Sequence, residues 1–266
     1  MSAYIPPAVR AQNLLSDLGI NQLPTPVVDI CKSLNIKCLF DADIDAEALI
    51  VKGGKRKTPV IAVKANRQYE SRARFSVAHE LGHFCIPDHL DEKYICTDED
   101  LNNYRSDKTA EREANEFAAE LLIPTTWVVQ AIKHQDVTLQ AIKTIAGECE
   151  TSLTSTALQV ASHCPDRIAV VYSQNDSVIW FKKAKSFDLY PNTGKLSRLS
   201  IAALYFQPNP LILEKKATVP LHAWTYDDRR YEYLVEESLF MPYLNAVLTI
   251  LTIPCDEFEE DAEDKY

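Results

Sequence analysis

Apolar and polar residues alternate along the chain in patterns that predict helices first and strands later. Apolar positions recur at helical spacing over 6–18 and 26–34, and the first of these helices opens with a proline pair. A short strand is predicted over 36–40. Two β-rich runs, 48–52 and 59–64, flank a loop with two glycines and predict a hairpin.

The next part of the chain predicts two longer helices with a short strand between them. Residues 68–84 have helical spacing and end before an Ile-Pro pair, where the residue preceding proline disfavours the helical conformation. Residues 92–97 predict a strand. Residues 107–122 predict the second helix, which is also followed by an Ile-Pro pair.

Residues 125–165 are predicted to be helical and contain a pattern similar to a helix-turn-helix. Its two helices cover 138–146 and 152–162, on either side of Gly147. The second helix holds the place of a recognition helix, yet residues 153–163 contain no lysine or arginine. Because a DNA reader grips phosphates with basic side chains, we interpret this unit as structural or substrate-facing.

Strand patterns dominate from residue 167 onward and indicate a separate α+β module. A hairpin is predicted from 168–172 and 177–182, and a helix near 197–206. Three further strands are predicted over 218–224, 231–235 and 247–253. The sequence therefore predicts an α+β fold with boundaries near residues 124, 165 and 255, followed by an acidic tail over 256–266.

Composition and charge narrow the function classes. The chain has 266 residues and a net charge of −10, of which the tail supplies −6 through seven acids and one lysine. Because phosphate binding needs a basic face, nucleic acid is not expected as the main partner. No run approaches the roughly 20 apolar residues of a membrane span, and the N-terminus shows no secretion signal. Seven cysteines form no C-x-x-C pair, which is typical of reduced thiols in a cytoplasmic protein.

The strongest chemical signal is the motif H-E-x-x-H at residues 79–83. Residues four apart lie on one face of a helix, so the imidazoles of His79 and His83 can bind one metal ion. Glu80 lies one residue further round, where its carboxylate can deprotonate a metal-bound water. Zinc lowers the pKa of such a water from about 16 to about 7, which makes hydroxide available at neutral pH.

A catalytic zinc site with two histidines needs a third protein ligand and an open position. On the helix over 107–122, Glu111 shares the inward side with small alanines and with Asn115. We predict Glu111 as the third ligand, and Asn115 as the acceptor for the free ring nitrogen of a ligand histidine. Three other acids recur on another side, as a solvated stripe would: Glu113, Glu116 and Glu120. Substituting Glu113 is therefore expected to leave zinc affinity nearly unchanged.

His89 is the alternative third ligand. His79, His83 and His89 have the outer spacing of H-E-x-x-H-x-x-G-x-x-H, but Ile86 stands where that pattern has glycine. A β-branched residue resists the positive φ of a sharp turn, so we expect His89 to line the cleft instead. The residue that stabilises the oxyanion stays open among three candidates: Tyr94, Tyr104 and His89.

These segments together resemble the ImmA/IrrE group of bacterial and phage metallopeptidases. The resemblance rests on R-F-S-V-A-H-E-L-G-H-F at 74–84 and E-x-E-A-N-x-F-A-x-x-L-L-x-P at 111–124, and it extends from about Pro24 to Pro124. It implies a zincin-like domain of the gluzincin type over 1–124, with zinc as the cofactor. It also implies limited cleavage of a helix-turn-helix repressor.

The resemblance carries further expectations about substrate binding and the second half of the chain. In zincin-like folds an extended substrate pairs with a sheet edge above the metal helix, a role that the hairpin over 48–64 would take. Its basic tip either favours acidic substrate segments or is an ordinary solvated turn, which is the slightly favoured interpretation; the tip consists of Lys52, Lys55, Arg56 and Lys57. Some family members carry a GAF-type sensor domain where this chain has the module over 166–255. Gluzincins often have aspartate one turn after the glutamate ligand, whereas this chain has Asn115, which still offers an acceptor.

The sequence thus predicts a cytoplasmic, zinc-dependent endopeptidase that makes a limited cut in a repressor or antitoxin-like protein, without a membrane or a specific nucleic acid as partner. The alternative is a non-catalytic regulatory or antitoxin-like binding module on the same scaffold. An intact Glu80 argues against that alternative, because a structural metal site gains nothing from a carboxylate beside an open position. A DNA-binding regulator is disfavoured by the charge.

Overall fold

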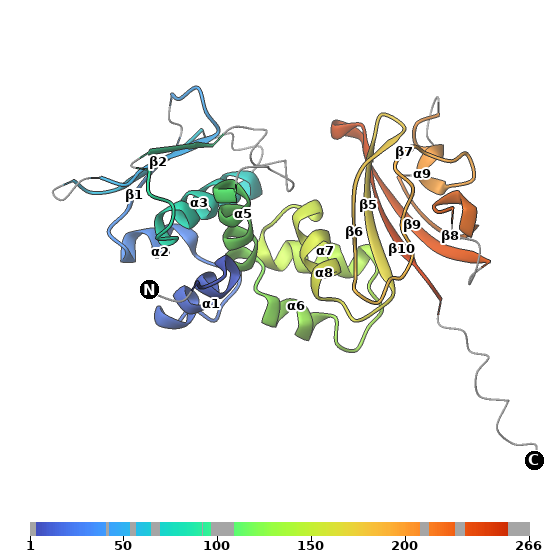
Figure 1. Cartoon of the computed structure of the whole chain (residues 1–266), viewed down its shortest axis with the longest axis horizontal. Helices are drawn as coiled ribbons and strands as arrows, with labels where there is room; N and C mark the ends of the chain where they lie inside the picture. The colour runs from blue at the N-terminus through green and yellow to red at the C-terminus, as the bar shows by residue number, and fades with distance from the viewer. Residues whose placement is uncertain are drawn as a thin grey trace, which may run out of the picture. The chain divides into compact units, whose positions relative to one another are not determined.

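The structure is a computed structural model in which the chain divides into two units, each with its own sheet (Figure 1). Unit 1 comprises residues 1–128 and 144–156, and unit 2 comprises residues 129–143 and 157–266. The structure describes residues 4–40, 43–53, 57–64, 70–91, 93–96, 109–207, 213–226 and 232–254. Helices and sheets occur together, so the predicted α+β class is confirmed. The predicted domain boundaries stay predictions, and the acidic tail lies outside the described residues.

The sheet of unit 1 has the strand order β1-β3-β2-β4. Its strands are β1 (Lys37–Leu39), β2 (Ala48–Val51), β3 (Val60–Val63) and β4 (Lys93–Cys96). β2 and β3 pair antiparallel, with Ala48 opposite Val63, which confirms the predicted hairpin. β1 pairs with β3 in parallel. The two inner strands carry Val, Ile and Ala almost throughout, as strands with an apolar face do.

The hairpin does not form the edge of this sheet, and this part of the sequence prediction is wrong. β2 pairs with β3 on one side and with β4 on the other, where Ile50 lies opposite Tyr94. The outer strands are β1 and β4, because β4 returns to the sheet after the long helix and covers the hairpin. Two of the four residues of the predicted basic tip, Lys55 and Arg56, lie outside the described residues.

Four of the described helices lie in unit 1 before residue 125. They are α1 (Pro7–Asp17), α2 (Val27–Ser33), α3 (Glu70–Cys85) and α5 (Thr109–Leu122). α3 contacts strands β2 and β3 as well as α5, and α5 also contacts α1 (Figure 1). Because α3 has neighbours on several sides, it is buried at every position from residue 76 to residue 83. The helix that carries H-E-x-x-H is therefore the central element of this unit.

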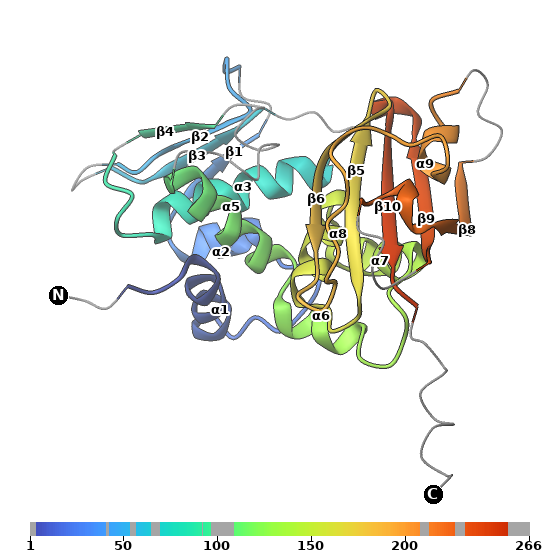
Figure 2. The same ribbon diagram turned by 45° about the vertical axis from the view of Figure 1, so that its right-hand side comes forward.

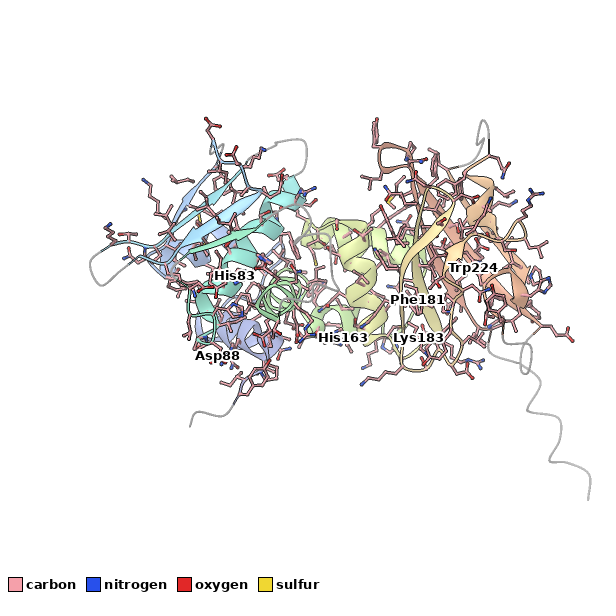
Figure 3. The ribbon with its side chains drawn as sticks, turned by 45° about the horizontal axis from the view of Figure 1, so that its top comes forward. His83, Asp88, His163, Phe181, Lys183 and Trp224 are labelled. Atoms are coloured by element: carbon pink, nitrogen blue, oxygen red, sulfur yellow. The ribbon has the colours of Figure 1, made fainter. Side chains whose placement is uncertain are left out.

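Three helices, α6 (Thr125–Ala131), α7 (Leu139–Cys149) and α8 (Leu153–His163), lie where the helical unit is predicted. The turn between α7 and α8 differs from the prediction, because α7 continues through Gly147. The left-handed residue is Glu150, with φ of +51°. Residues 153–162 of α8 are buried or half-buried, and His163, labelled in Figure 3, is the exposed residue at its end.

The described strands of unit 2 form an antiparallel sheet of order β7-β6-β5-β10-β9-β8, and Figure 2 labels its strands β6, β5, β10, β9 and β8. Its strands are β5 (Ile168–Gln174), β6 (Ser177–Lys183), β7 (Gly194–Lys195), β8 (Glu214–Pro220), β9 (Tyr233–Met241) and β10 (Ala246–Thr252). The predicted hairpin of β5 and β6 is confirmed. Its turn residues Asn175 and Asp176 have φ of +51° and +61°, a conformation that Asn and Asp tolerate.

Short helical segments of unit 2 replace parts of the predicted elements. They are α9 (Ile201–Leu204), η2 (Leu221–Ala223) and η3 (Pro242–Leu244). The helix predicted near 197–206 thus has one turn only, and the strand predicted over 218–224 ends at Pro220. None of the described helices has the length and apolar character that a membrane span requires.

β9 extends well beyond the predicted strand over 231–235 and ends at Met241. Its inward positions include Leu234, Glu236 and Ser238, which are buried. Two of these three are polar, so the alternation of apolar and polar residues that marks a half-buried strand is missing. The Glu236 carboxylate accepts hydrogen bonds from four donors: Ile201 N at 2.9 Å, Ala202 N at 2.7 Å, Trp224 Nε1 at 2.7 Å and Ser238 Oγ at 3.0 Å.

Candidate metal centre

Helix α3 presents His79, Glu80 and His83 with no exposed surface (His83 is labelled in Figure 3). A close approach of α5 makes this arrangement possible. A Cβ added to Gly82 would lie 3.1 Å from Cα and 3.2 Å from the carbonyl oxygen of Ala114, a tight fit against backbone atoms. Small residues on both helices therefore let α5 bring a side chain to the histidines.

That side chain is Glu111. Its Oε2 lies 3.1 Å from Nε2 of His79 and 3.4 Å from Nε2 of His83. The two Nε2 atoms are 3.1 Å apart. All three residues are buried, and their ligand atoms lie within 4.8 Å of one another. The structure thus brings together the three residues that the sequence predicts as metal ligands; their role as ligands stays a prediction.

The outward-facing nitrogens of the two histidines have partners as well. Nδ1 of His79 lies 2.9 Å from Oδ1 of Asn115, which is the contact predicted for this asparagine. Nδ1 of His83 lies 3.0 Å from Nδ1 of His89. Each imidazole is therefore held at Nδ1 and turns Nε2 toward Glu111.

His89 lies beside the predicted ligands and is not part of their group. It contacts His83 instead of joining the three ligand atoms, and its other nitrogen, Nε2, lies 3.0 Å from Oε2 of Glu113. His89 is 4% exposed. Glu113 is therefore no solvated acid, and the predicted stripe is wrong at this residue. No periodicity of α5 signals this contact, because the partner comes from the turn after α3.

A second contact restrains His83 through the sheet. The ring of Tyr94 on β4 stacks on the imidazole of His83, with centroids 4.0 Å apart and an interplanar angle of 16°. The ammonium of Lys52 lies 5.0 Å from the centre of the Tyr94 ring and donates a hydrogen bond to the carbonyl of His89. Both oxyanion candidates in the described part of the chain thus touch His83, while Tyr104 lies outside the described residues.

The protonation states of the site suit metal ligands. Burial lowers the pKa of His83 to about 4, so the imidazole is neutral at pH 7. Burial alone would raise the pKa of Glu111, but hydrogen bonding with His79 and His83 outweighs it and holds the pKa well below its ordinary value. Metal binding needs a neutral imidazole and an ionised carboxylate, and both are present here.

The donor set fits a zinc ion. With each Nδ1 turned to an outer partner, two Nε2 atoms and one carboxylate oxygen bring lone pairs within 3.4 Å of one another. A cation among the three atoms would stabilise such a group, because lone pairs in low dielectric repel each other. Two histidines and one glutamate, with one position left open, form a known set of catalytic zinc ligands.

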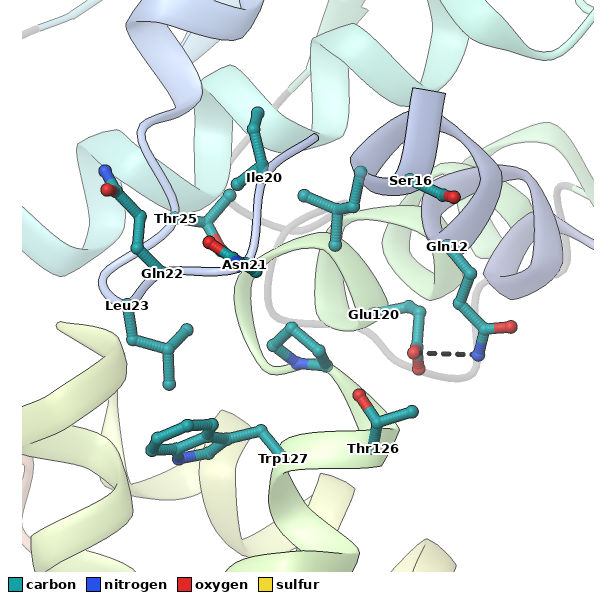
Figure 4. Close-up of a pocket in the computed structure, with 12 residues that line it drawn as sticks. Gln12, Ser16, Ile20, Asn21, Gln22, Leu23, Thr25, Glu120, Thr126 and Trp127 are labelled. Carbon is teal, nitrogen blue, oxygen red and sulfur yellow. Dashed lines mark hydrogen bonds between the residues drawn. The ribbon is translucent and has the colours of Figure 1, made fainter. Parts of the chain in front are cut away.

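A pocket of about 350 Å³ lies elsewhere in unit 1, between α1, the loop over 20–25 and the start of α6 (Figure 4). None of the predicted site residues lines it. Glu120, at this pocket, is 2% exposed and accepts hydrogen bonds from Gln12 Nε2 at 2.9 Å and from Thr125 N at 3.0 Å. The predicted solvated stripe is therefore wrong at Glu120 too. Its carboxylate is covered because it binds Gln12 of α1 and the backbone N–H of Thr125, which follows α5.

A sheet over a buried H-E-x-x-H helix, with a glutamate from a second helix, defines the zincin-like class of peptidase domain. Residues 31–158 match the family model described as the IrrE N-terminal-like domain. This segment includes the residues that carry the resemblance to the ImmA/IrrE family, and the predicted resemblance is confirmed.

Comparison with curated proteins gives no match. Among solved structures, the chain is similar to a Mycobacterium tuberculosis transcriptional regulator. The TM-score is 0.60 at 13% identity, over 92% of this chain and 76% of that chain. At this identity the similarity concerns the fold.

Proposed function

We propose that this chain is a zinc-dependent endopeptidase that makes a limited, specific cut in a regulatory protein such as a repressor or an antitoxin. The observation that carries the proposal is the grouping of three potential ligands, His79, His83 and Glu111. The two histidines and Glu80 lie on a fully buried stretch of α3, and Glu111 reaches them from α5. A structural metal site would have no use for a buried carboxylate next to its ligands. The family match supports the same reading.

In this proposal His79, His83 and Glu111 hold the zinc. When bound, zinc supplies a Lewis acid that polarises the peptide carbonyl and acidifies a water molecule. Glu80 accepts a proton from the attacking water while the oxygen of that water bonds to the carbonyl carbon. It then delivers the proton to the leaving nitrogen as the carbon–nitrogen bond breaks. Asn115 and His89 keep the two imidazoles oriented during this cycle.

β4 is the strand on which an extended substrate would pair. It is an outer strand of the sheet, and its Tyr94 lies against His83, so a peptide along β4 would pass beside the metal ligands. An outer strand offers backbone groups to an incoming strand, which is a common mode of peptide recognition. This replaces the hairpin as the proposed substrate edge.

A protein partner is favoured over duplex DNA. A recognition helix must enter the major groove with several exposed side chains. In α8, residues 153–162 are buried or half-buried, and the helix contains no lysine or arginine. Salt-resistant, sub-micromolar binding to duplex DNA in a gel shift would overturn this part of the proposal.

The decisive experiment compares wild type with Glu80→Gln, both loaded with zinc, during co-expression with repressors encoded beside the gene. Glu80→Gln keeps the shape and the ligands but lacks the base, so cleavage should fall by at least about 10²–10⁴-fold while zinc content stays the same. A truncated repressor should appear with wild type alone. Cleavage by zinc-loaded Glu80→Gln at the wild-type rate would refute the peptidase proposal.

A further inference from the structure

Three hydrogen bonds in succession join four side chains, beginning at His83. Nδ1 of His83 lies 3.0 Å from Nδ1 of His89, and Nε2 of His89 lies 3.0 Å from Oε2 of Glu113. The hydroxyl of Tyr4 donates to the other carboxylate oxygen of Glu113 at 3.0 Å. The chain thus links α3, the turn after it, α5 and the segment before α1.

The direction of the protons along this chain follows from its outer end. An ionised carboxylate only accepts hydrogen bonds, so Glu113 requires the proton of His89 on Nε2. Nδ1 of a neutral His89 then has a lone pair and accepts the proton on Nδ1 of His83. Nε2 of His83 is left with a lone pair, and this is the atom that faces Glu111 and His79.

We propose that Glu113 and His89 are positioning residues of the metal centre. The carboxylate sets the tautomer of two histidines in succession and so presents the lone pair of His83 to the zinc. The inference rests on the proposed zinc site but not on the substrate. It assigns a role to Glu113, which the spacing of acids along α5 predicts to be solvated.

The geometry separates this role from simple packing. Tyr94 stacks on the face of His83, whereas His89 meets its edge at Nδ1. Loss of His89 or Glu113 therefore leaves the stacked contact and the burial of α3 in place. What is lost is the control of which nitrogen carries the proton, a loss that typically weakens metal binding by about 10–100-fold.

The first measurement is zinc affinity by competition with a chelator. Glu113→Leu and His89→Phe keep the size of the side chain but remove the acceptor, and each should weaken zinc binding by about 10–100-fold. Glu113→Gln and His89→Asn retain an acceptor oxygen, so each should recover most of the affinity. Glu116→Gln is the matched control, because it removes an exposed acid from the same helix and should leave the affinity unchanged.

The second measurement is the tautomer of His89 by ¹⁵N NMR of the zinc-loaded protein. Wild type should carry the proton on Nε2 alone, and Glu113→Leu should give a mixture of tautomers, an effect that a packing role would not produce. Unchanged affinity in Glu113→Leu and His89→Phe, or an unchanged tautomer, would overturn the inference. If wild type itself fails to bind zinc, the proposed metal site fails instead, so the two failures are distinguishable.

Discussion

Glu111 in unit 1 and Glu236 in unit 2 are both buried carboxylates, with 7% and 0% of their surface exposed, but their surroundings differ. Glu236 is surrounded by four fixed donors from α9, Trp224 and Ser238. Glu111 faces the Nε2 atoms of two histidines. One carboxylate has its acceptor positions filled by the protein, and the other shares a space that a cation can enter.

The pKa values follow this difference. Burial raises the pKa of Glu236, and the hydrogen bonds from Trp224, Ile201, Ala202 and Ser238 only moderate that rise. Burial acts on Glu111 in the same direction, but His79 and His83 reverse it. Burial of an acid is therefore a poor guide to a functional site by itself. The informative feature is whether its partners are permanent donors or groups that can exchange a proton for a metal ion.

The largest effect expected from this comparison is on zinc binding. Glu111→Ala removes one of three protein ligands, and zinc sites with four ligands bind with roughly 10–16 kcal/mol in total. We expect zinc affinity to fall by about three orders of magnitude, or about 4 kcal/mol. Chelator competition measures it, with Glu236→Ala as the control that should bind zinc like wild type. Equal losses in both variants would contradict the distinction between the two acids.

The reverse pattern is expected for stability. Glu236→Ala leaves four buried donors without their acceptor, and each such group costs about 1–3 kcal/mol. After partial relaxation, we expect the free energy of unfolding to fall by about 3 kcal/mol. Urea unfolding of the zinc-free protein measures this quantity. A change below about 0.5 kcal/mol, the range of ordinary surface substitutions, would show that Glu236 is not structural.

The pH dependence of stability sharpens the comparison further. Because burial raises the pKa of Glu236, the folded state holds this proton more tightly than the unfolded chain does. The resulting stability is fully present below the unfolded pKa of about 4.3 and is lost as the pH rises through the folded value. Relative to Glu236→Gln, which does not titrate, the wild type should lose about 1.4 kcal/mol for each unit that separates the two pKa values. If the wild type instead gained stability relative to Glu236→Gln as the pH rises, the sign would be opposite and the account would be refuted.

The smallest effect is expected at Tyr4, the outer end of the hydrogen bonds that lead from His83 through His89 and Glu113. Tyr4 is 63% exposed, and its hydroxyl reaches Glu113 from the surface. Tyr4→Phe leaves Glu113 accepting from His89, so zinc affinity should change by no more than roughly twofold, as for other surface substitutions. The same chelator competition tests this. A loss as large as that of Glu113→Leu would show that the carboxylate is held mainly by Tyr4.

Features that depend on neighbours in the sequence could be predicted from the sequence. The spacing of His79 and His83, the helix around them and the hairpin with Asn175 and Asp176 all follow from contacts within a few residues. The family resemblance rests on the same short motifs and is confirmed. Glu111 could be chosen as the predicted third ligand because helical geometry places it on a different side of α5 from Glu113.

Tertiary structure alone decided which strand lies at the sheet edge and which acids are buried. β4 lies beside the hairpin because its residues pair with residues of β2 that come 42–48 positions earlier, from Val51↔Lys93 to Ala48↔Cys96. Glu113 contacts His89, which lies 24 positions away in the sequence. β9 lacks the alternation of apolar and polar residues because its buried Glu236 accepts hydrogen bonds from donors up to 35 positions away. No local pattern records such pairings, because a buried polar group is acceptable wherever distant elements bring its partners. The sequence by itself therefore determined the residue types of the predicted ligands and the helix that carries the two histidines. The fold decided which further side chains contact the predicted ligands, because that depends on how the turn after α3 and the start of α5 pack together.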